Sequence, residues 1–224
     1  DDDTGLVYDG SDTLWFTEDD YYNVVPFDLT THTAGAPVIP AVGFGSWLQL
    51  QAYASGDYWL NCNCGDDEIA RRFTTAGALV DEVNTDTDLG NSTNIQSMAF
   101  DATGGVLWIQ GRDNSGSDDE VLLRVDSDAE PDVLLDRFVV GVPFEGLTYD
   151  GTDLWGIAEV FAHMGESTRP QSVIVRIATD TGEIAATYAN PASDIQLYGL
   201  AAIGDDFYAV GEDITGVTVI LHLT

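Results

Sequence analysis

The stretch Gly146-Leu-Thr-Tyr-Asp-Gly-Thr-Asp-Leu-Trp155 decides the fold, because variants of it occur five times along the chain. Each copy is a short apolar run, a turn rich in Gly and Asp, and an aromatic residue that opens a second apolar run. The other copies are Gly5–Trp15, Leu50–Trp59, Ser97–Trp108 and Gly199–Tyr208. Their final aromatic residues are 44, 49, 47 and 53 residues apart, so the chain is a repeat protein.

The fourth repeat shows most clearly how each unit is built. Apolar and polar residues alternate along four short runs, which is the pattern of half-buried strands. These runs are Gly146–Tyr149, Leu154–Glu159, Ser172–Ile177 and Glu183–Tyr188, with turns at Asp150-Gly151 and Thr181-Gly182. Four antiparallel strands in a repeat of this length are typical of a β-propeller blade.

The chain is therefore predicted to be a single all-β domain, a five-bladed β-propeller of four-stranded antiparallel blades. The blades are expected at about residues 5–42, 46–84, 95–140, 144–190 and 196–224. The last blade has only three predicted strands, at Leu197–Ile203, Phe207–Gly211 and Val217–Leu223. The ring is expected to close by packing of blade five against blade one; completion by another chain or a missing segment is the alternative. The outer edge of blade five would offer unpaired backbone groups to a partner strand.

The segment Gly146–Ile184, with GLTYDGTDLWGI at its start and VIVRIATDTGEI at its end, resembles a broad superfamily of extracellular propellers. That superfamily includes NHL-like and YncE-like repeats and, at five blades, the plant-type glutaminyl cyclotransferases. Members of the cyclotransferase family carry a Glu-Gly-Leu-Thr segment that brings a catalytic carboxylate to the mouth of the central channel. Phe144-Glu145-Gly146-Leu147-Thr148 matches this segment, so the resemblance implies Glu145 as the catalytic residue of such an enzyme.

The composition is strongly acidic. Thirty-nine Asp and Glu residues face seven Arg and no Lys, and the formal net charge is −32. Apolar residues make up 44% of the chain, which is enough to build one buried core. The charge repels phosphate backbones and anionic lipid headgroups, so neither nucleic-acid binding nor membrane insertion is expected. This composition is typical of extreme halophiles and their viruses, and an acidic secreted domain of a GC-rich bacterium is the alternative.

The most promising surface for recognition is the face on which the innermost strands begin, here called the top face. The connections between blades and the loops between second and third strands share this face. Four of these five loops carry adjacent acids and two add aromatic residues, a combination suited to cations, basic peptides or sugar rings. The predicted ligand site lies between blades one, three and four and comprises Asp19, Asp20, Tyr21, Tyr22, Asp118, Asp119, Phe161 and His163.

Two further features concern metals and thiols. Oxygen-bearing side chains alternate along Asn84-Thr-Asp86-Thr-Asp88 as in a calcium loop, but the EF-hand Gly and Glu are replaced by Leu89 and Ile95. A looser site for Ca²⁺ or Na⁺ at Asp86 and Asp88 is one alternative, and no bound ion is the other. Cys62 and Cys64 share one face of a strand with Cα atoms roughly 6.6 Å apart, so buried free thiols are favoured over a disulfide.

Taken from sequence alone, the chain is predicted to be a non-enzymatic propeller for binding, adhesion or assembly. It would act outside a cell or on a virion in a halophilic system, with a protein or glycan on a surface as its partner. No Gly-x-Ser-x-Gly, phosphate-binding Gly-rich loop or His-Glu-x-x-His motif occurs in the sequence. Two alternatives stay open: a glutaminyl-cyclotransferase-like enzyme, and a sensor or scaffold domain of a longer secreted protein.

Overall fold

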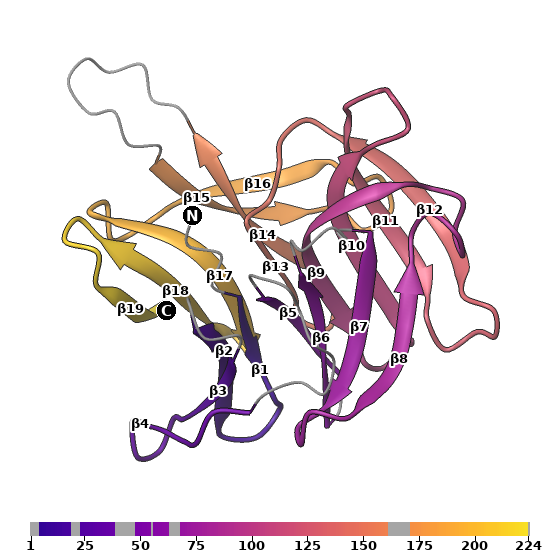
Figure 1. Ribbon diagram of the computed structural model, residues 1–224. Coiled ribbons are helices and arrows are strands. Elements are labelled where there is room, and N and C mark those ends of the chain that lie inside the picture. Colours follow the sequence, from indigo (N-terminus) through magenta and orange to yellow (C-terminus); the bar gives the residue numbers. More distant parts are fainter. Residues whose placement is uncertain are drawn as a thin grey trace.

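The computed structural model confirms the predicted fold, because five antiparallel sheets surround a central axis (Figure 1). The residues that it describes are 5–18, 23–38, 48–54, 56–62, 68–160 and 171–223. No helix occurs among these residues, so none that could cross a membrane is found there. Four sheets have four strands each, and the fifth has three.

Each sheet is a meander whose strands pair in sequence order. Blade one consists of β1 (Leu6–Tyr8), β2 (Thr13–Glu18), β3 (Asn23–Asp28) and β4 (Thr33–Ala34). Blade two consists of β5 (Leu48–Ala54), β6 (Asp57–Cys62), β7 (Ile69–Thr74) and β8 (Leu79–Asn84). Blade three consists of β9 (Thr93–Asp101), β10 (Val106–Asp113), β11 (Glu120–Asp126) and β12 (Val133–Val140).

The last two blades follow the predicted strands closely. Blade four consists of β13 (Gly146–Tyr149), β14 (Leu154–Val160), β15 (Gln171–Ile177) and β16 (Ile184–Ala189), and each end lies within one residue of its predicted position. Blade five consists of β17 (Ile195–Ile203), β18 (Asp206–Asp213) and β19 (Thr218–Leu223), and it is the three-stranded blade that the sequence predicted.

The ring closes without strand exchange among the described residues. The innermost strands of neighbouring blades contact one another all the way round, and β1 lies against β17. Because β1 forms its ladder with β2 and β17 forms its ladder with β18, blades one and five meet through side chains. Leu6 and Leu14 pack there with Ala201 and Val210. The expectation that blade five packs directly against blade one is confirmed.

Five apolar clusters hold the ring together, one at each junction between neighbouring blades. The aromatic residue that ends each sequence repeat packs toward the next blade in the ring. These residues are Trp15, Trp59, Trp108, Trp155 and Tyr208. The constant aromatic position of the repeat is therefore core between blades, because only a side chain pointing out of the sheet can reach a neighbouring blade.

The few arginines are also placed by the repeat. In blades two, three and four an Arg on the third strand lies directly opposite the repeat Trp on the second strand. Each of these arginines pairs with a carboxylate of its own blade, at 3.0 Å for Arg72–Asp57, 3.0 Å for Arg124–Asp136 and 3.3 Å for Arg176–Asp153. In blade five Tyr208 and His222 stack instead, with ring centroids 4.6 Å apart.

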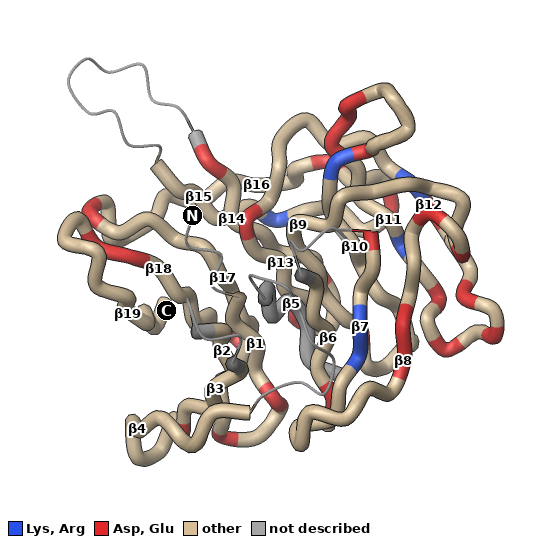
Figure 2. The backbone as a smooth tube through the Cα atoms, in the orientation of Figure 1, with Lys and Arg blue, Asp and Glu red and all other residues tan. Residues whose placement is uncertain are grey.

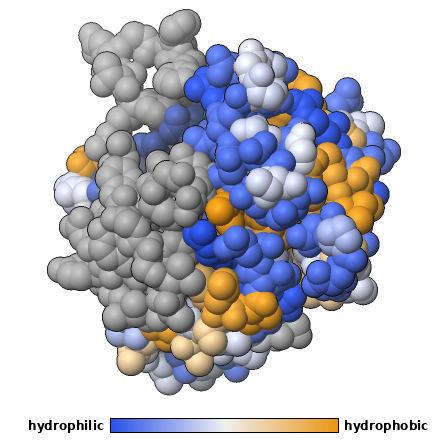
Figure 3. Space-filling view, turned by 45° about the vertical axis from the view of Figure 1, so that its right-hand side comes forward, coloured by the Kyte–Doolittle hydropathy of each residue, from blue (hydrophilic) through white to orange (hydrophobic). Residues whose placement is uncertain are grey.

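The acidic residues are spread over the turns and strands of all five blades (Figure 2). The part of the face that is coloured in Figure 3 is largely hydrophilic, with separate apolar patches between the polar side chains. Exposed apolar side chains occur on three outer strands, with Leu79 and Val80 on β8, Val133, Leu135 and Val139 on β12, and Ile184 and Tyr188 on β16. A net charge of −32 is thus carried by the whole surface of a protein with an ordinary apolar core.

Candidate functional site

The loop between β10 and β11 rises from the top face and carries two predicted ligand-binding residues at its tip. Asp118 and Asp119 are exposed, and Asp118 has a φ of 55°, which Asp tolerates better than most residues. The Asp119 amide donates to the Ser117 hydroxyl at 3.3 Å, and the Asp113 amide donates to the Asp119 carbonyl at 2.9 Å. The loop therefore returns on itself and presents both carboxylates to solvent.

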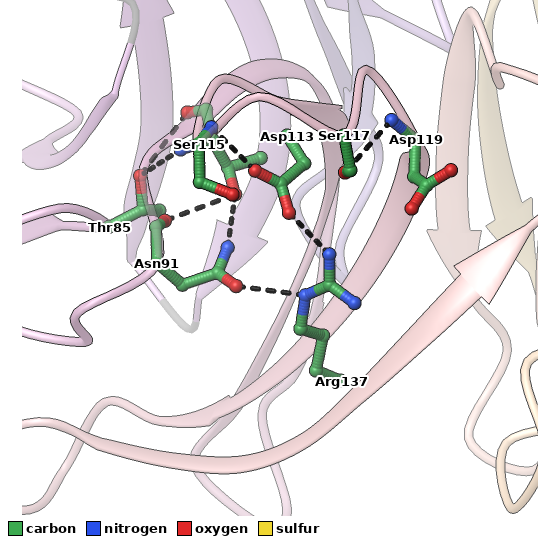
Figure 4. A network of polar contacts seen from close by, with 8 residues as sticks. Thr85, Asn91, Asp113, Ser115, Ser117, Asp119 and Arg137 are labelled. Carbon is green, nitrogen blue, oxygen red and sulfur yellow. Dashed lines mark hydrogen bonds and ion pairs between the residues drawn. The ribbon is translucent and has the colours of Figure 1, made fainter.

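The base of this loop is fixed by a buried carboxylate (Figure 4). Asp113 is only 5% exposed, and it forms an ion pair with Arg137 of β12. Hydrogen bonds from Ser115, followed in weight by Arg137, lower the pKa of the Asp113 carboxyl from its ordinary value. Asp113 is therefore held as a carboxylate, which fixes the first turn of the loop.

The same network joins the loop to the connection between blades two and three. The Arg137 Nε donates to the Asn91 Oδ1 at 2.9 Å (Figure 4). The Asn114 amide donates to the Ser92 carbonyl, also at 2.9 Å. One side of the loop is thus tied to β12 and the other to the neighbouring connection. A short exposed tip on such a base suits recognition, because little conformational entropy remains to be lost on binding.

A second group of polar residues lies next to the backbone at Phe144 and Glu145, just before β13. Glu145 is half-buried, and its amide donates to the Ile157 carbonyl at 2.9 Å. The preceding residue, Phe144, is buried, and its amide donates to the side-chain oxygen of Gln110 at 3.3 Å. The residue implied by the cyclotransferase resemblance therefore lies at the start of an innermost strand, held in place through blade three.

Gln110 is the centre of this group and has no exposed surface. Its Nε2 donates to Gln96 and to Glu120, both at 3.0 Å, and its Oε1 accepts from the Ser97 hydroxyl at 3.2 Å. Gln96 is the extra residue of a β-bulge, since Gln110 pairs with Ser97 while the next residue, Gly111, pairs with Ile95.

Glu120 is a titratable group of this network, and its pKa is raised above the ordinary value. Burial raises the pKa of its carboxyl, while Arg112 and the hydrogen bond from Gln110 act in the opposite direction. Gln110 joins the Glu120 carboxylate to the Phe144 amide, so this polar network reaches the backbone next to Glu145. Such a network can orient an amide or a cation and exchange a proton with it.

The sequence reasoning missed Gln96, Gln110 and Glu120. One signal was available: Gln110 is a polar residue inside the apolar run of β10, at a position where the strand is buried on both sides. A fully buried polar side chain must find hydrogen-bond partners, so it predicts a network even when the partners are not known.

Of the other predicted site residues, only Asp86 and Asp88 belong to the described part of the chain. Asp19, Asp20, Tyr21, Tyr22, Phe161 and His163 lie outside the described residues, as do the side chains of Cys62 and Cys64. Asp86 and Asp88 lie in the turn after β8, where the Asn84 side chain accepts from the Asp86 amide and Asp88 accepts from the Asn84 amide. Among the described residues no group of three or more His, Cys, Asp or Glu side chains is arranged to hold a metal ion. The cation site at Asp86 and Asp88 stays a prediction.

Comparison with known proteins places the fold and no more. No protein-family model matches the sequence, and no curated protein matches it either. A glutaminyl cyclase of Myxococcus xanthus superposes with a TM-score of 0.62 at 11% identity, covering 98% of this chain and 89% of that one. A chain of a nidogen/laminin complex gives 0.54 at 13% identity, with 98% and 79% covered.

Larger propellers are similar over part of their length. The Pan2 WD40 domain of Neurospora crassa gives a TM-score of 0.56 at 9% identity, covering 97% of this chain. Hydrazine synthase of Kuenenia stuttgartiensis gives 0.53 at 10% identity, covering 93% of this chain. The chain spans only 59% and 55% of those two proteins. The similar structures thus include binding proteins and enzymes, and they share the propeller architecture with this chain.

Proposed function

We propose that this propeller is a binding module whose top face recognises a protein or glycan without catalysing a reaction. The observation that carries the proposal is the β10–β11 loop, whose base is fixed by Asp113, Arg137 and Asn91 while Asp118 and Asp119 stay exposed at its tip. A buried ion pair that fixes a loop and leaves its charged tip in solvent favours recognition over a purely structural role. The exposed carboxylates would orient a cation or sugar hydroxyl groups.

The proposed setting is the outer surface of a cell or virion in a halophilic system. Its support is physical: 39 acids without a single Lys give mutual repulsion that only concentrated salt screens effectively. The outer edge of β19, which pairs with no strand in the described part of the chain, is a second candidate contact, for a homo- or hetero-oligomer, because edge strands accept partner strands.

The test measures attachment of labelled protein to purified haloarchaeal cell envelopes in concentrated KCl. Replacing Asp118 and Asp119 by Ser should reduce attachment at least about tenfold, if each exposed contact contributes roughly 0.7 kcal/mol. The matched control replaces Asp180 and Asp205 by Ser, because these acids are also exposed on turns and the charge change is the same. Equal loss in both variants would reduce the effect to overall charge and refute the loop's role.

One observation favours an enzyme of the glutaminyl-cyclotransferase kind as the second candidate. Glu145 directly precedes the innermost strand β13, and the amide of its neighbour Phe144 contacts Gln110, which also donates to Glu120, a carboxyl with a raised pKa. In that reaction the α-amino nitrogen of an N-terminal Gln attacks the carbonyl carbon of the side-chain amide of the same residue. Glu145 would take a proton from the amine and return it to the ammonia that leaves.

Cyclisation of an N-terminal Gln peptide in high salt separates the two candidates. Turnover that disappears in Glu145→Gln and persists in Glu183→Gln, an exposed control, would replace the binding proposal by the enzymatic one. Absence of turnover together with retained envelope attachment in Glu145→Gln supports the binding module.

A further inference from the structure

A pocket between blades four and five opens on the top face. Its volume is about 190 Å³, and it is bordered by the start of β15, the end of β16, the connection to β17 and the turn between β18 and β19. Its lining includes Ser172, Val173, Asn190, Asp194, Ile195 and Ile214. We call it the interblade pocket.

The walls of the interblade pocket are fixed before any ligand arrives. The Asn190 side chain donates to the Ile195 carbonyl at 2.8 Å and accepts from the Ala192 amide at 2.9 Å. Ser172, which is only 3% exposed, accepts from the Leu197 amide at 2.9 Å and so joins β15 to β17. The floor and the connecting loop therefore keep their shape in the absence of a partner.

The pocket has one apolar side and one acidic side. Val173 and Ile195 contribute apolar surface, and Ile214 at the rim is 69% exposed, the most exposed large apolar residue of the described chain. On the other side Asp194 is exposed and has no ion pair within the described residues. Gln196, which also lines the pocket, donates to Glu159 at 2.7 Å.

The size of the pocket limits what it can hold. Its 190 Å³ corresponds to about a dozen water positions, whereas pockets for cofactors and drug-sized ligands reach roughly 300–1,000 Å³. A single long side chain fits this scale. Lys and Arg place an apolar stem against apolar surface and keep a cationic head at a polar rim, which is the arrangement of the two sides here.

Among the described residues no cationic side chain pairs with Asp194. The chain contains no Lys, and five of its arginines already pair with carboxylates elsewhere in their own blades. We propose that the interblade pocket receives a Lys or Arg side chain of a partner protein, whose stem packs on Ile214 and Ile195 and whose cation pairs with Asp194. This inference rests on the proposed binding function and names the chemistry of the partner.

The test is a titration of the isotope-labelled protein with short peptides, followed by amide NMR shifts in about 0.5 M KCl to suppress general attraction to the acidic surface. The probes are acetyl-Gly-Lys-Gly-amide and its Arg analogue, and the norleucine analogue lacks only the charge. Saturable shifts at Asp194, Ile195 and Thr215 are expected with the two cationic peptides. The norleucine peptide should bind at least about fivefold more weakly, the effect of one exposed charge pair.

Two substitutions test the two sides of the pocket separately. Asp194→Asn should weaken binding of the Lys peptide at least about fivefold, and Ile214→Ser should weaken it for the norleucine and Lys peptides alike. Asp180→Asn, an exposed acid at the opposite end of blade four, is the matched control and should change affinity less than about 1.5-fold.

The proposal is overturned if shifts are scattered over the acidic surface, or if Asp180→Asn weakens binding as much as Asp194→Asn. Its failure is distinguishable from failure of the proposed function. Peptide binding insensitive to Asp194→Asn removes the pocket while envelope attachment through Asp118 and Asp119 still stands. Loss of envelope attachment in Asp194→Asn, with the Asp118 and Asp119 variant unaffected, would transfer recognition from the loop to the pocket.

Discussion

Blades three and five are built from the same repeat, yet their third strands are buried to different extents. In blade three, Leu122 and Leu123 of β11 have no exposed surface, because β10 and β12 pair with both edges. In blade five, Ile220 and Leu221 of β19 are only half-buried, and β18 is the one strand that pairs with β19 among the described residues. A fourth strand therefore contributes mainly by completing the burial of the third strand.

The two blades also differ in how their charges are balanced. Blade three contains Arg112, Arg124 and Arg137, and the last two pair with Asp136 and Asp113. The described part of blade five contains no Arg, and its single basic side chain is that of His222, which lies 3.2 Å from Asp206. Blade five should therefore depend more on dissolved cations than blade three does.

The largest expected effect is that of salt on the whole ring. Between about 0.1 M and 2 M KCl the Tm should rise by more than about 10 °C, or roughly 3–5 kcal/mol for a domain of this size, because salt screens the repulsion among 39 acids. Hydrogen exchange at both salt concentrations should show the larger gain in protection in β18 and β19 than in β10 and β11. A flat Tm would remove the argument for a halophilic setting.

The second effect compares core truncations in the two third strands. Leu122→Ala should lower the free energy of unfolding by about 3–4 kcal/mol, because it leaves a cavity in a fully enclosed site. Ile220→Ala should cost only about 1 kcal/mol, since its side chain is half-exposed and the site can collapse. Denaturant unfolding in 2 M KCl measures both. Equal losses would mean that β19 is covered by a strand outside the described residues.

The repeat made the fold predictable from sequence, because each copy specifies its own hairpins and its own aromatic contact with the next blade. The three strands of blade five were predictable for the same reason, since its copy of the repeat and the alternating run that follows it specify β17, β18 and β19. The partners within the polar networks were not predictable. Gln110 and Arg137 form hydrogen bonds with residues on other strands and outside their own blade. These contacts depend on how far each side chain reaches, and the repeat period of the sequence does not specify them.

The third prediction concerns the ion pair between Arg137 on the fourth strand of blade three and Asp113 at the base of the β10–β11 loop. Blade five has no such pair among the described residues. Arg137→Ala should lower the free energy of unfolding by about 2 kcal/mol, because it leaves the Asp113 carboxylate almost buried with only Ser115 as its partner. Amides 114–119 should exchange faster. Arg137→Lys should restore only part of the loss, since Lys cannot contact Asp113 and Asn91 through a planar fork. Unchanged exchange in the loop would contradict the role given to this residue.

The smallest effect comes from the turn between β11 and β12 of blade three, where an ionised Asp132 lowers the free energy of unfolding. Burial, followed by repulsion from Asp81, Asp88, Glu130 and Asp126, raises the pKa of the Asp132 carboxyl to about 6. The folded protein therefore holds this proton more tightly than the unfolded chain does. The associated stability is complete in acid, is lost as the pH rises through about 6, and is absent at neutral pH.

Asp132→Asn should remove that penalty. Because the side chain is partly exposed and its interactions are screened, the gain at pH 7 should be about 1 kcal/mol in low salt, and it should shrink in 2 M KCl. The gain should decrease as the pH falls through about 6 and vanish near pH 4, where Asp132 of the wild-type protein is protonated and therefore uncharged, like the Asn that replaces it. Asp205→Asn, on an exposed turn of blade five, is the control and should give a smaller gain with no step near pH 6. A gain for Asp132→Asn that is the same at pH 4 and pH 7 would show that the amide acts by hydrogen bonding, and that like-charge repulsion at this turn does not limit the stability of blade three.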